Sequence, residues 1–234
     1  MGERQIMLIT GTRKGIGRYL AEYYAKKGFF VYGCSRTPVD YESKNYQHFY
    51  LDVSDETSAA HLFSEIRKTH DRLDILINNA GIASMNYTLL ASVQTAQNIL
   101  STNVVGTFIF CREASKLMHN NSYGRIVNIS TIHVPLCTTG SSLYSASKAA
   151  IEQLSKILAR EVASSGITVN TLGLSFVNHT GMVENLSEDA ISKTLDQTIL
   201  KSKLDFSDVA HAINFFISEK SKMVTGQTLY LGGV

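Results

Sequence analysis

The chain has 234 residues, of which 44% are hydrophobic and 18% are charged, and it carries a net charge of +2. This composition is typical of a folded globular protein and excludes a disordered chain, and the small net charge gives no electrostatic case for binding nucleic acid or an anionic membrane. No apolar run approaches the roughly 20 residues that a membrane-spanning helix needs.

Short apolar runs alternate with longer segments of helical period along the sequence. Because the apolar runs are almost continuous, the alternation predicts an α/β fold, a doubly wound parallel seven-stranded sheet (Rossmann fold) with helices on both faces. The patterns predict strands over residues 6–10, 29–34, 47–51, 74–78, 125–130, 167–172 and 228–231. Helices are predicted over 16–27, from 55 onward, and over 92–119, 143–164 and 207–218.

Residues 1–234 are expected to form a single domain, because the chain has only two prolines and no linker-like stretch. The least regular stretch, near 174–206, follows the sixth predicted strand. Segments at the carboxyl ends of parallel strands often cover a ligand crevice, so this stretch is predicted to be a substrate-loop insertion.

A glycine-rich turn, Thr10-Gly11-Thr12-Arg13-Lys14-Gly15-Ile16-Gly17, joins the first predicted strand to the first helix. Glycines allow the backbone to turn tightly and to approach a pyrophosphate, which then rests on the helix N-terminus. The spacing is G-x-x-x-G-x-G rather than the commoner G-x-G-x-x-G. Its place between a strand and an amphipathic helix is what favours dinucleotide binding.

The end of the second predicted strand favours NADP(H) over NAD. An NAD site usually has an acid there, but this strand ends in Ser35-Arg36 and the next acid is Asp40. Arg36 and Lys14, with Arg13 beside it, are suited to a ribose 2′-phosphate. Surface loops often carry such cations without a ligand, so NAD remains the alternative.

The sequence Tyr144-Ser145-Ala146-Ser147-Lys148 opens the helix predicted over 143–164. Positions i and i+4 share one helix face, so the ammonium of Lys148 is expected near the phenol of Tyr144. A neighbouring positive charge favours phenolate, so the pKa of Tyr144 is expected to fall toward neutrality. A tyrosine tuned in this way can exchange a proton with a substrate oxygen.

Taken together, these motifs resemble the short-chain dehydrogenase/reductase family in its compact, single-domain form. The matching elements are the turn at 10–17, Asp52-Val53, the segment Asn78-Asn79-Ala80-Gly81, Asn103, Tyr144-x-x-x-Lys148 and residues 226–229. They cover essentially the whole chain in the family's order. The resemblance implies cofactor contacts from Gly11, Arg13, Lys14, Gly15, Ile16, Gly17, Ser35, Arg36, Asp52, Val53, Asn79, Ala80, Gly81, Tyr144, Lys148, Val177 and Thr180. On the residue pattern alone, a helix-start position is the alternative for Asp52.

The resemblance also implies the catalytic set. Tyr144 is the expected acid in carbonyl reduction, Lys148 the residue that holds the nicotinamide ribose, and Asn103 the residue that bends a helix and holds a water in a proton relay. The family's carbonyl-binding serine lies thirteen positions before the tyrosine, which here is Thr131. A threonine hydroxyl offers the same donor and acceptor, with the neighbouring Ser130 as the alternative.

The chain departs from the family after the sixth predicted strand. Leu174-Ser175 occupies the position of the family's Pro-Gly, and the segment to Met182 is one residue longer than usual. The loop is therefore expected to follow a different path beside the cofactor. The contact of Thr180 with the nicotinamide amide depends on that path.

Among family members, the chain is most similar to 3-oxoacyl-acyl-carrier-protein reductases of fatty acid biosynthesis, through residues 124–128 and 166–170. This implies an acyl-thioester substrate, an acyl carrier protein as a possible partner docked at Arg125, and a cytoplasmic homotetramer or homodimer. Such reductases tend to have a second arginine directly before the stretch that is 166–170 here, and this chain has Ser165 at that position. The alternatives are a reductase or dehydrogenase of a free small-molecule ketone or alcohol, in a specialised or sugar pathway, and a non-catalytic NADP-binding protein.

Several reactive residue types are assigned no role. His133 and His179 are read as incidental polar residues, because none of the seven histidines has metal-ligand spacing, and no metal is expected. Cys34, Cys111 and Cys137 are far apart, which indicates reduced thiols rather than a disulfide or zinc site.

Overall fold

The computed structural model describes residues 4–184 and 186–234. Over these residues, seven parallel strands form one sheet in the order β3-β2-β1-β4-β5-β6-β7. The strands are β1 (Ile6–Thr10), β2 (Phe30–Ser35), β3 (Tyr46–Tyr50), β4 (Ile75–Asn78), β5 (Gly124–Thr131), β6 (Ile167–Leu174) and β7 (Thr228–Tyr230). This confirms the predicted fold class, and all seven predicted strands are present.

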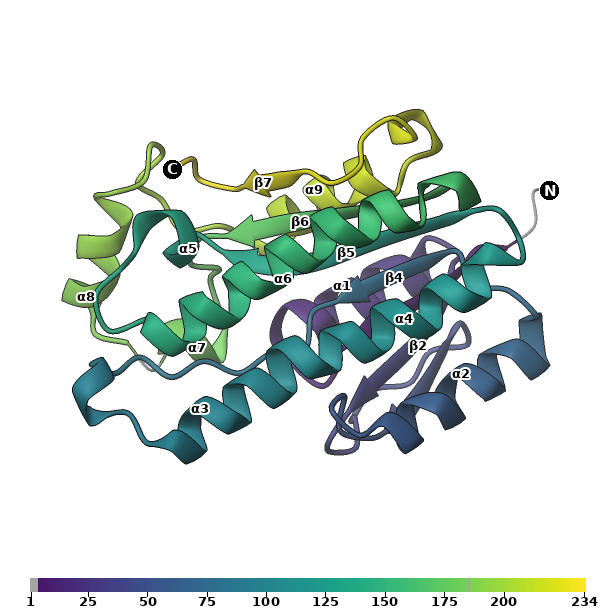
Figure 1. Cartoon of the computed structure of the whole chain (residues 1–234), viewed down its shortest axis with the longest axis horizontal. Helices are drawn as coiled ribbons and strands as arrows, with labels where there is room; N and C mark the ends of the chain where they lie inside the picture. The colour runs from purple at the N-terminus through teal and green to yellow at the C-terminus, as the bar shows by residue number, and fades with distance from the viewer. Residues whose placement is uncertain (1–3, 185) are drawn as a thin grey trace.

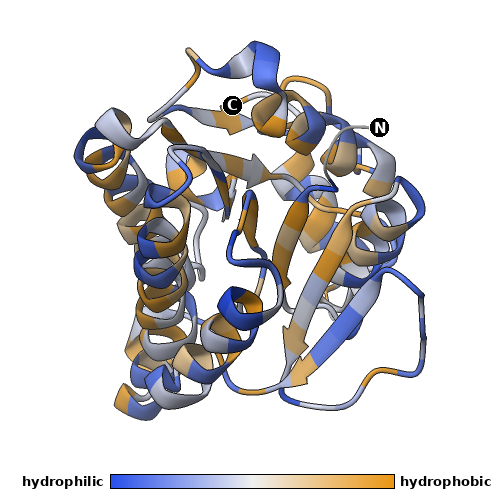
Figure 2. Cartoon of the chain, turned by 90° about the vertical axis from the view of Figure 1, so that its right-hand side faces the viewer, coloured by the Kyte–Doolittle hydropathy of each residue, from blue (hydrophilic) through white to orange (hydrophobic). Residues whose placement is uncertain are grey.

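Two layers of helices cover the sheet (Figure 1). They are α1 (Gly15–Lys26), α2 (Glu56–His70), α3 (Val93–Leu100), α4 (Gly106–His119), α5 (His133–Leu136), α6 (Ser142–Glu161), α7 (Gly181–Glu184), α8 (Glu188–Leu195) and α9 (Phe206–Ile217). Helices α2, α4 and α6 share one hydrophobic core with the sheet, and α1 and α9 share the other. Figure 2 shows the hydrophobic strands between these layers, with hydrophilic residues on the outer helix surfaces.

Local signals account for the ends of several elements. The Asp55 carboxylate accepts a hydrogen bond from the Thr57 N–H at 3.0 Å and so caps α2. Gly28 has a φ of +93°, which glycine adopts readily, and ends α1 as predicted.

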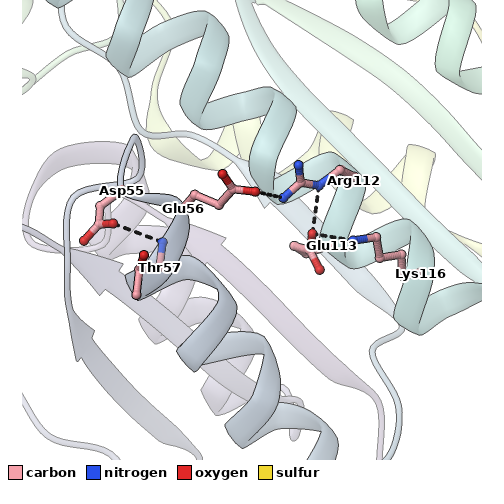
Figure 3. A network of polar contacts seen from close by, with 6 residues as sticks. All are labelled: Asp55, Glu56, Thr57, Arg112, Glu113 and Lys116. Atoms are coloured by element: carbon pink, nitrogen blue, oxygen red, sulfur yellow. Dashed lines mark hydrogen bonds and ion pairs between the residues drawn. The ribbon is translucent and has the colours of Figure 1, made fainter.

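On the surface, Arg112 of α4 bonds Glu56 of α2 at 2.6 Å, within a network that also holds Glu113 and Lys116 (Figure 3).

Two segments differ from the sequence-based expectation. The single helix predicted over 92–119 is divided by a π-helical turn, Ser101–Val105, between α3 and α4. The segment 174–206 contains the short helices α7 and α8, which pack through a small apolar cluster of Phe176, Ile191 and Leu195. It therefore has regular structure and a local core of its own.

The strand order reverses between β1 and β4, with β2 on one side and β5 on the other. In a parallel sheet, this reversal opens a crevice at the carboxyl ends of the strands. The described helices include none that is both long enough and apolar enough to cross a bilayer.

Candidate active site

Three connected hollows lie along the carboxyl edge of the sheet. The inner pocket, about 130 Å³, is lined by Thr131, Tyr144 and Lys148. The cofactor cleft, about 350 Å³, follows the glycine-rich turn. The two share Ile16, Asn79, Gly81, Ile82 and Thr180, so they adjoin. An outer pocket of about 550 Å³ shares His133 and Phe176 with the inner one.

The glycine-rich turn is held against the end of β4. The Asn79 amide donates to the carbonyls of Thr10 and Gly11 at 2.9 and 3.2 Å, and the backbone N–H groups of Asn79 and Ala80 donate to Thr10 Oγ1. Gly11 has a φ of +75°, and a Cβ on Gly17 would lie 2.2 Å from the Gly11 carbonyl. These two positions therefore require glycine.

The cleft fits a dinucleotide. A Cβ built on Gly15 meets only Thr180 Cγ2, at 3.9 Å, so the start of α1 faces open space where a pyrophosphate can approach the backbone. The first turn of α1 has no acidic residue. The cleft is lined by three cationic side chains, Arg13, Lys14 and Arg36, and by one carboxylate, that of Asp52. This excess of positive charge suits a phosphate group.

Asp52 and Arg36 form an ion pair across the cleft at 3.9 Å. Asp52 Oδ1 also accepts hydrogen bonds from the Ser54 N–H and hydroxyl at 2.9 and 2.7 Å. The N-cap of α2 is Asp55, so the helix-start alternative for Asp52 is wrong. Val53 and Ala80 line the same cleft.

A chain of side chains connects β3 to the glycine-rich turn, and sequence patterns did not point to it. The Ser35 hydroxyl donates to the Thr37 carbonyl at 2.7 Å, so His48 Nε2 donates to Ser35 Oγ at 3.0 Å. His48 Nδ1 then accepts from the Tyr46 hydroxyl at 2.6 Å, and Tyr46 accepts from Thr12 at 2.8 Å. The contact of Thr12 with Tyr46 joins residues 34 positions apart, and that of Ser35 with His48 joins residues 13 positions apart, which local patterns cannot reveal.

Tyr144 and Lys148 face the inner pocket from α6 and are both buried. Lys148 Nζ lies 6.0 Å from the centre of the Tyr144 ring and donates a hydrogen bond to the Ile129 carbonyl at 2.8 Å. Burial raises the pKa of Tyr144 to about 12, opposed by a hydrogen bond with Thr131. Burial lowers the pKa of Lys148 to about 8.

The expected fall in the pKa of Tyr144 is therefore wrong in direction for this structure. Burial in a low-dielectric site disfavours phenolate, and the interaction that opposes it comes from Thr131, whereas Lys148 is bonded to the Ile129 carbonyl. The tyrosine is a protonated acid at neutral pH.

Thr131 and Ser130, the last two residues of β5, have different partners on α6. The Thr131 hydroxyl lies near enough to Tyr144 to lower the pKa of the tyrosine, and it accepts a hydrogen bond from the His133 backbone N–H at 3.4 Å. Ser130 instead donates to Glu152 Oε1 at 2.6 Å, and the second Glu152 oxygen accepts from Tyr230 at 2.8 Å. Of the two candidates, Thr131 is the one bonded to the tyrosine.

Asn103 lies fully buried in the π-helical turn. Its side-chain oxygen accepts from the Ile82 N–H at 2.9 Å, and its amide donates to the Ile82 carbonyl and to Ser147 Oγ, each at 2.9 Å. The side chain thus fixes the loop after β4 to α6. The interruption of the regular α-helix at this asparagine is a π-helical turn.

Strand β6 ends at Leu174, two residues beyond the predicted end, and Ser175 follows it outside the strand. Val177 then pairs with Leu204, and Thr180 Oγ1 donates to the Val177 carbonyl at 2.8 Å. Thr180 borders both the inner pocket and the cofactor cleft, opposite Gly15.

His133 was read as incidental from the sequence, yet it lines both the inner and the outer pocket. Its side chain is 2% exposed. The signal available in the sequence was its position two residues after Thr131, at the end of a strand. By contrast, His179 and Cys137 are exposed. No group of three or more metal-ligating side chains occurs in the described part of the chain.

Comparisons with known proteins agree with this geometry. The family model described as short chain dehydrogenase matches residues 5–191. The chain is 35% identical to the 3-oxoacyl-acyl-carrier-protein reductase FabG of Buchnera aphidicola subsp. Schizaphis graminum, over 99% of this chain and 97% of that protein. Among solved structures, ElxO with NADP bound has a TM-score of 0.89 and 30% identity, covering 98% of this chain and 97% of that one. A tyrosine-to-phenylalanine variant of ElxO with NADPH bound gives the same TM-score and identity, with 97% of each chain covered.

Proposed function

This chain belongs to the short-chain dehydrogenase family, and from that premise we propose that it reduces the ketone carbonyl of a 3-oxoacyl thioester or a similar compound. It is an NADP-dependent oxidoreductase that acts on CH–OH and C=O groups. The observation that carries the proposal is the contact of Tyr144 with Thr131, beside Lys148, where the inner pocket adjoins the cofactor cleft.

The cofactor is NADP(H), and when bound it supplies the hydride. Its phosphates are assigned to the start of α1, with Arg13, Lys14 and Arg36 at the 2′-phosphate, because these cations line one cleft. Asn79 and Thr180 are assigned to the part of the cleft that adjoins the inner pocket, since both border the two hollows. The remaining contacts are assigned to Gly11, Gly15, Ile16, Gly17, Ser35, Asp52, Val53, Ala80, Gly81 and Val177.

In the proposed mechanism, Tyr144 gives its proton to the carbonyl oxygen as that oxygen gains negative charge. The raised pKa of Tyr144 supports this role, because the hydroxyl is protonated before the reaction. Thr131 holds the same oxygen through its hydroxyl, and Lys148 supplies positive charge near the tyrosine as the proton leaves. Asn103 positions these groups through its bonds to Ile82 and Ser147.

The 3-oxoacyl thioester is proposed from the similarity to FabG, whose name specifies that substrate. The proposed docking of a carrier protein at Arg125 lacks support from its surroundings. Arg125 is 3% exposed, donates to the Gly124 and Gly166 carbonyls at 2.8 and 3.3 Å, and stacks on Tyr123. It also lies near the amino end of β5, at the edge opposite the inner pocket.

A free small-molecule ketone is the second candidate, and the burial of Arg125 favours it. The outer pocket is lined by both polar and apolar side chains, among them Asn86, Gln197, Met85 and Leu186, so its lining does not separate the two candidates.

The test begins with titration of the protein with NADPH and NADH, followed by NADPH oxidation with an acetoacetyl thioester, with and without carrier protein, and with simple ketones. Tight NADPH binding with thioester turnover supports the proposal, and no gain from the carrier refutes docking. Turnover of free ketones alone would favour the second candidate. Binding without turnover on any carbonyl would favour a non-catalytic NADP-binding protein.

Tyr144→Phe provides the matched control. It should abolish reduction and leave the dissociation constant for NADPH nearly unchanged, because it removes one hydroxyl and keeps the ring. Retained activity in this variant would refute the assigned acid.

A further inference from the structure

His133 is held rigidly beside the reacting groups. Its ring lies edge-on to Tyr144 and to Phe176, with centroid distances of 6.2 and 5.8 Å. The backbone N–H of His133 donates to Thr131 Oγ1, and the backbone carbonyl of His133 accepts from the Ser145 hydroxyl at 3.2 Å. Packing and backbone bonds therefore fix the imidazole at the boundary between the inner and outer pockets.

The Nδ1 atom of this ring is buried and has no hydrogen-bond partner within the described residues. A buried polar atom left unpaired costs roughly 1–3 kcal/mol, so it calls for an explanation. No described residue bonds Nδ1, and His133 lines both pockets, so a molecule bound there is the remaining source of a partner.

We propose that His133 is a specificity-determining residue whose Nδ1 hydrogen-bonds a second, uncharged oxygen of the substrate, close to the carbonyl that is reduced. This inference rests on the proposed function, and it specifies the substrate class as 1,3-dicarbonyl compounds. Thr131 and Tyr144 hold the reacting oxygen, and the neighbouring His133 holds the oxygen two carbons away.

The surroundings of His133 favour a neutral oxygen over a carboxylate or phosphate. Burial lowers the pKa of His133 to about 4, so the ring is neutral near pH 7. The nearest positively charged groups that line the two pockets are already engaged, Lys148 with the Ile129 carbonyl and Lys193 with Asp189 at 2.7 Å. A buried anion beside a neutral ring would lack a counter-charge.

The experiment compares three methyl ketones: an acetoacetyl thioester, 2-pentanone, which lacks the second oxygen, and acetoacetate, which is charged. His133→Phe keeps the aromatic packing and removes the hydrogen bond. It should lower kcat/KM for the thioester by roughly 10- to 100-fold and change the value for 2-pentanone by less than about threefold. The wild type should prefer the thioester to acetoacetate.

Two further variants sharpen the comparison. His133→Asn retains an amide at the place of Nδ1 and should recover part of the loss on the thioester. His61→Phe, at an exposed position on α2, is the matched control and should change neither substrate. An equal loss on the thioester and 2-pentanone in His133→Phe would overturn the inference, since it would indicate a packing role only.

A binding measurement separates this inference from the proposed function. Tyr144→Phe loaded with NADPH is titrated with ethyl acetoacetate and with 2-pentanone, while the ring nitrogen signals of His133 are followed by ¹⁵N NMR. Tighter binding of the dicarbonyl, with a shift of the Nδ1 signal and loss of the preference in the double variant with His133→Phe, supports the role of His133 even if wild type turns over neither ketone. Equal affinity for the two ligands, or no binding of either, overturns it.

Discussion

At the scale of single residues, adjacent hydroxyls on β5 have different partners. Thr131 contacts Tyr144, whereas Ser130 donates to Glu152, which lies two helical turns along α6 from the tyrosine. Both partners lie on α6, so the two neighbouring hydroxyls of β5 reach positions eight residues apart on one helix. The resemblance to the family favoured Thr131, with Ser130 as the alternative, and the partners of the two side chains support Thr131.

Thr131→Val and Ser130→Ala should therefore have different effects. Thr131→Val preserves shape and removes the hydroxyl, so we expect kcat to fall by roughly 10²- to 10³-fold. Ser130→Ala leaves a buried carboxylate oxygen of Glu152 unpaired, so we expect a loss of roughly 1–3 kcal/mol in the free energy of unfolding and a small change in kcat. Steady-state kinetics and urea unfolding measure the two effects. A similar fall in kcat for both variants would contradict the assignment.

Burial of Lys148 makes a prediction about stability and pH. The pKa of Lys148 is about 8 in the folded protein, below its ordinary value of 10.5. Between pH 8 and pH 10.5 the unfolded chain binds more protons than the folded protein, so the free energy of unfolding rises with pH. Below pH 8 the lysine is charged in both states, and burying its charge lowers the free energy of unfolding by about 3 kcal/mol. Lys148→Met removes that cost and loses the bond to Ile129, worth roughly 1 kcal/mol.

Lys148→Met is thus expected to be inactive and more stable than wild type at pH 7 by about 2 kcal/mol. The difference should shrink as the pH rises toward 9.5, where the wild-type lysine is mostly neutral. Urea unfolding of both proteins at the two pH values measures this. A difference that does not depend on pH would show that the ammonium is not destabilised by burial.

At the scale of elements, a π-helical turn and a side-chain relay adapt regular structure to the site. The turn at Ser101–Val105 adds a residue to the helix and brings Asn103 inward, where it bonds Ile82 and Ser147. Such bulges occur frequently at functional sites. The periodicity of 92–119 predicted helix correctly, but the extra residue depends on the buried partners of Asn103, which are 21 and 44 positions away.

The relay from Thr12 through Tyr46 and His48 to Ser35 should support cofactor binding. Tyr46→Phe removes the central hydroxyl, so we expect the dissociation constant for NADPH to rise about fivefold, corresponding to one hydrogen bond of about 1 kcal/mol. Tyr50→Phe, at an exposed position on the same strand, is the control and should leave binding unchanged. Fluorescence titration measures both. Equal affinities in the two variants would indicate that the relay supports the fold and not the cofactor.

At the scale of the whole molecule, the outer face of the α3–α4–α6 layer carries exposed apolar residues. Leu100, Val105, Phe108 and Ile157 are each between 44% and 46% exposed. The expected homotetramer or homodimer is consistent with such a face, because contiguous exposed apolar residues often mark an interface.

Phe108→Glu is therefore expected to lower the oligomeric state, because it would bury a charge in the contact. Phe215→Glu is the control, since Phe215 is also half-exposed but lies on α9, on the other side of the sheet. Size-exclusion chromatography with light scattering gives the molar mass. A monomeric wild type, or an unchanged mass in Phe108→Glu, would refute this interface.

The sequence by itself determined the features that depend on local steric and periodic rules. The glycines of 11–17 predict a tight turn, and the apolar runs predict buried strands. The four-residue spacing of Tyr144 and Lys148 predicts that they share one face of a helix. Only the tertiary structure decided the burial that raises the pKa of Tyr144 and the unpaired Nδ1 of His133. These properties are set by neighbours from distant segments, because dielectric environment and hydrogen-bond partners depend on packing and not on position along the chain.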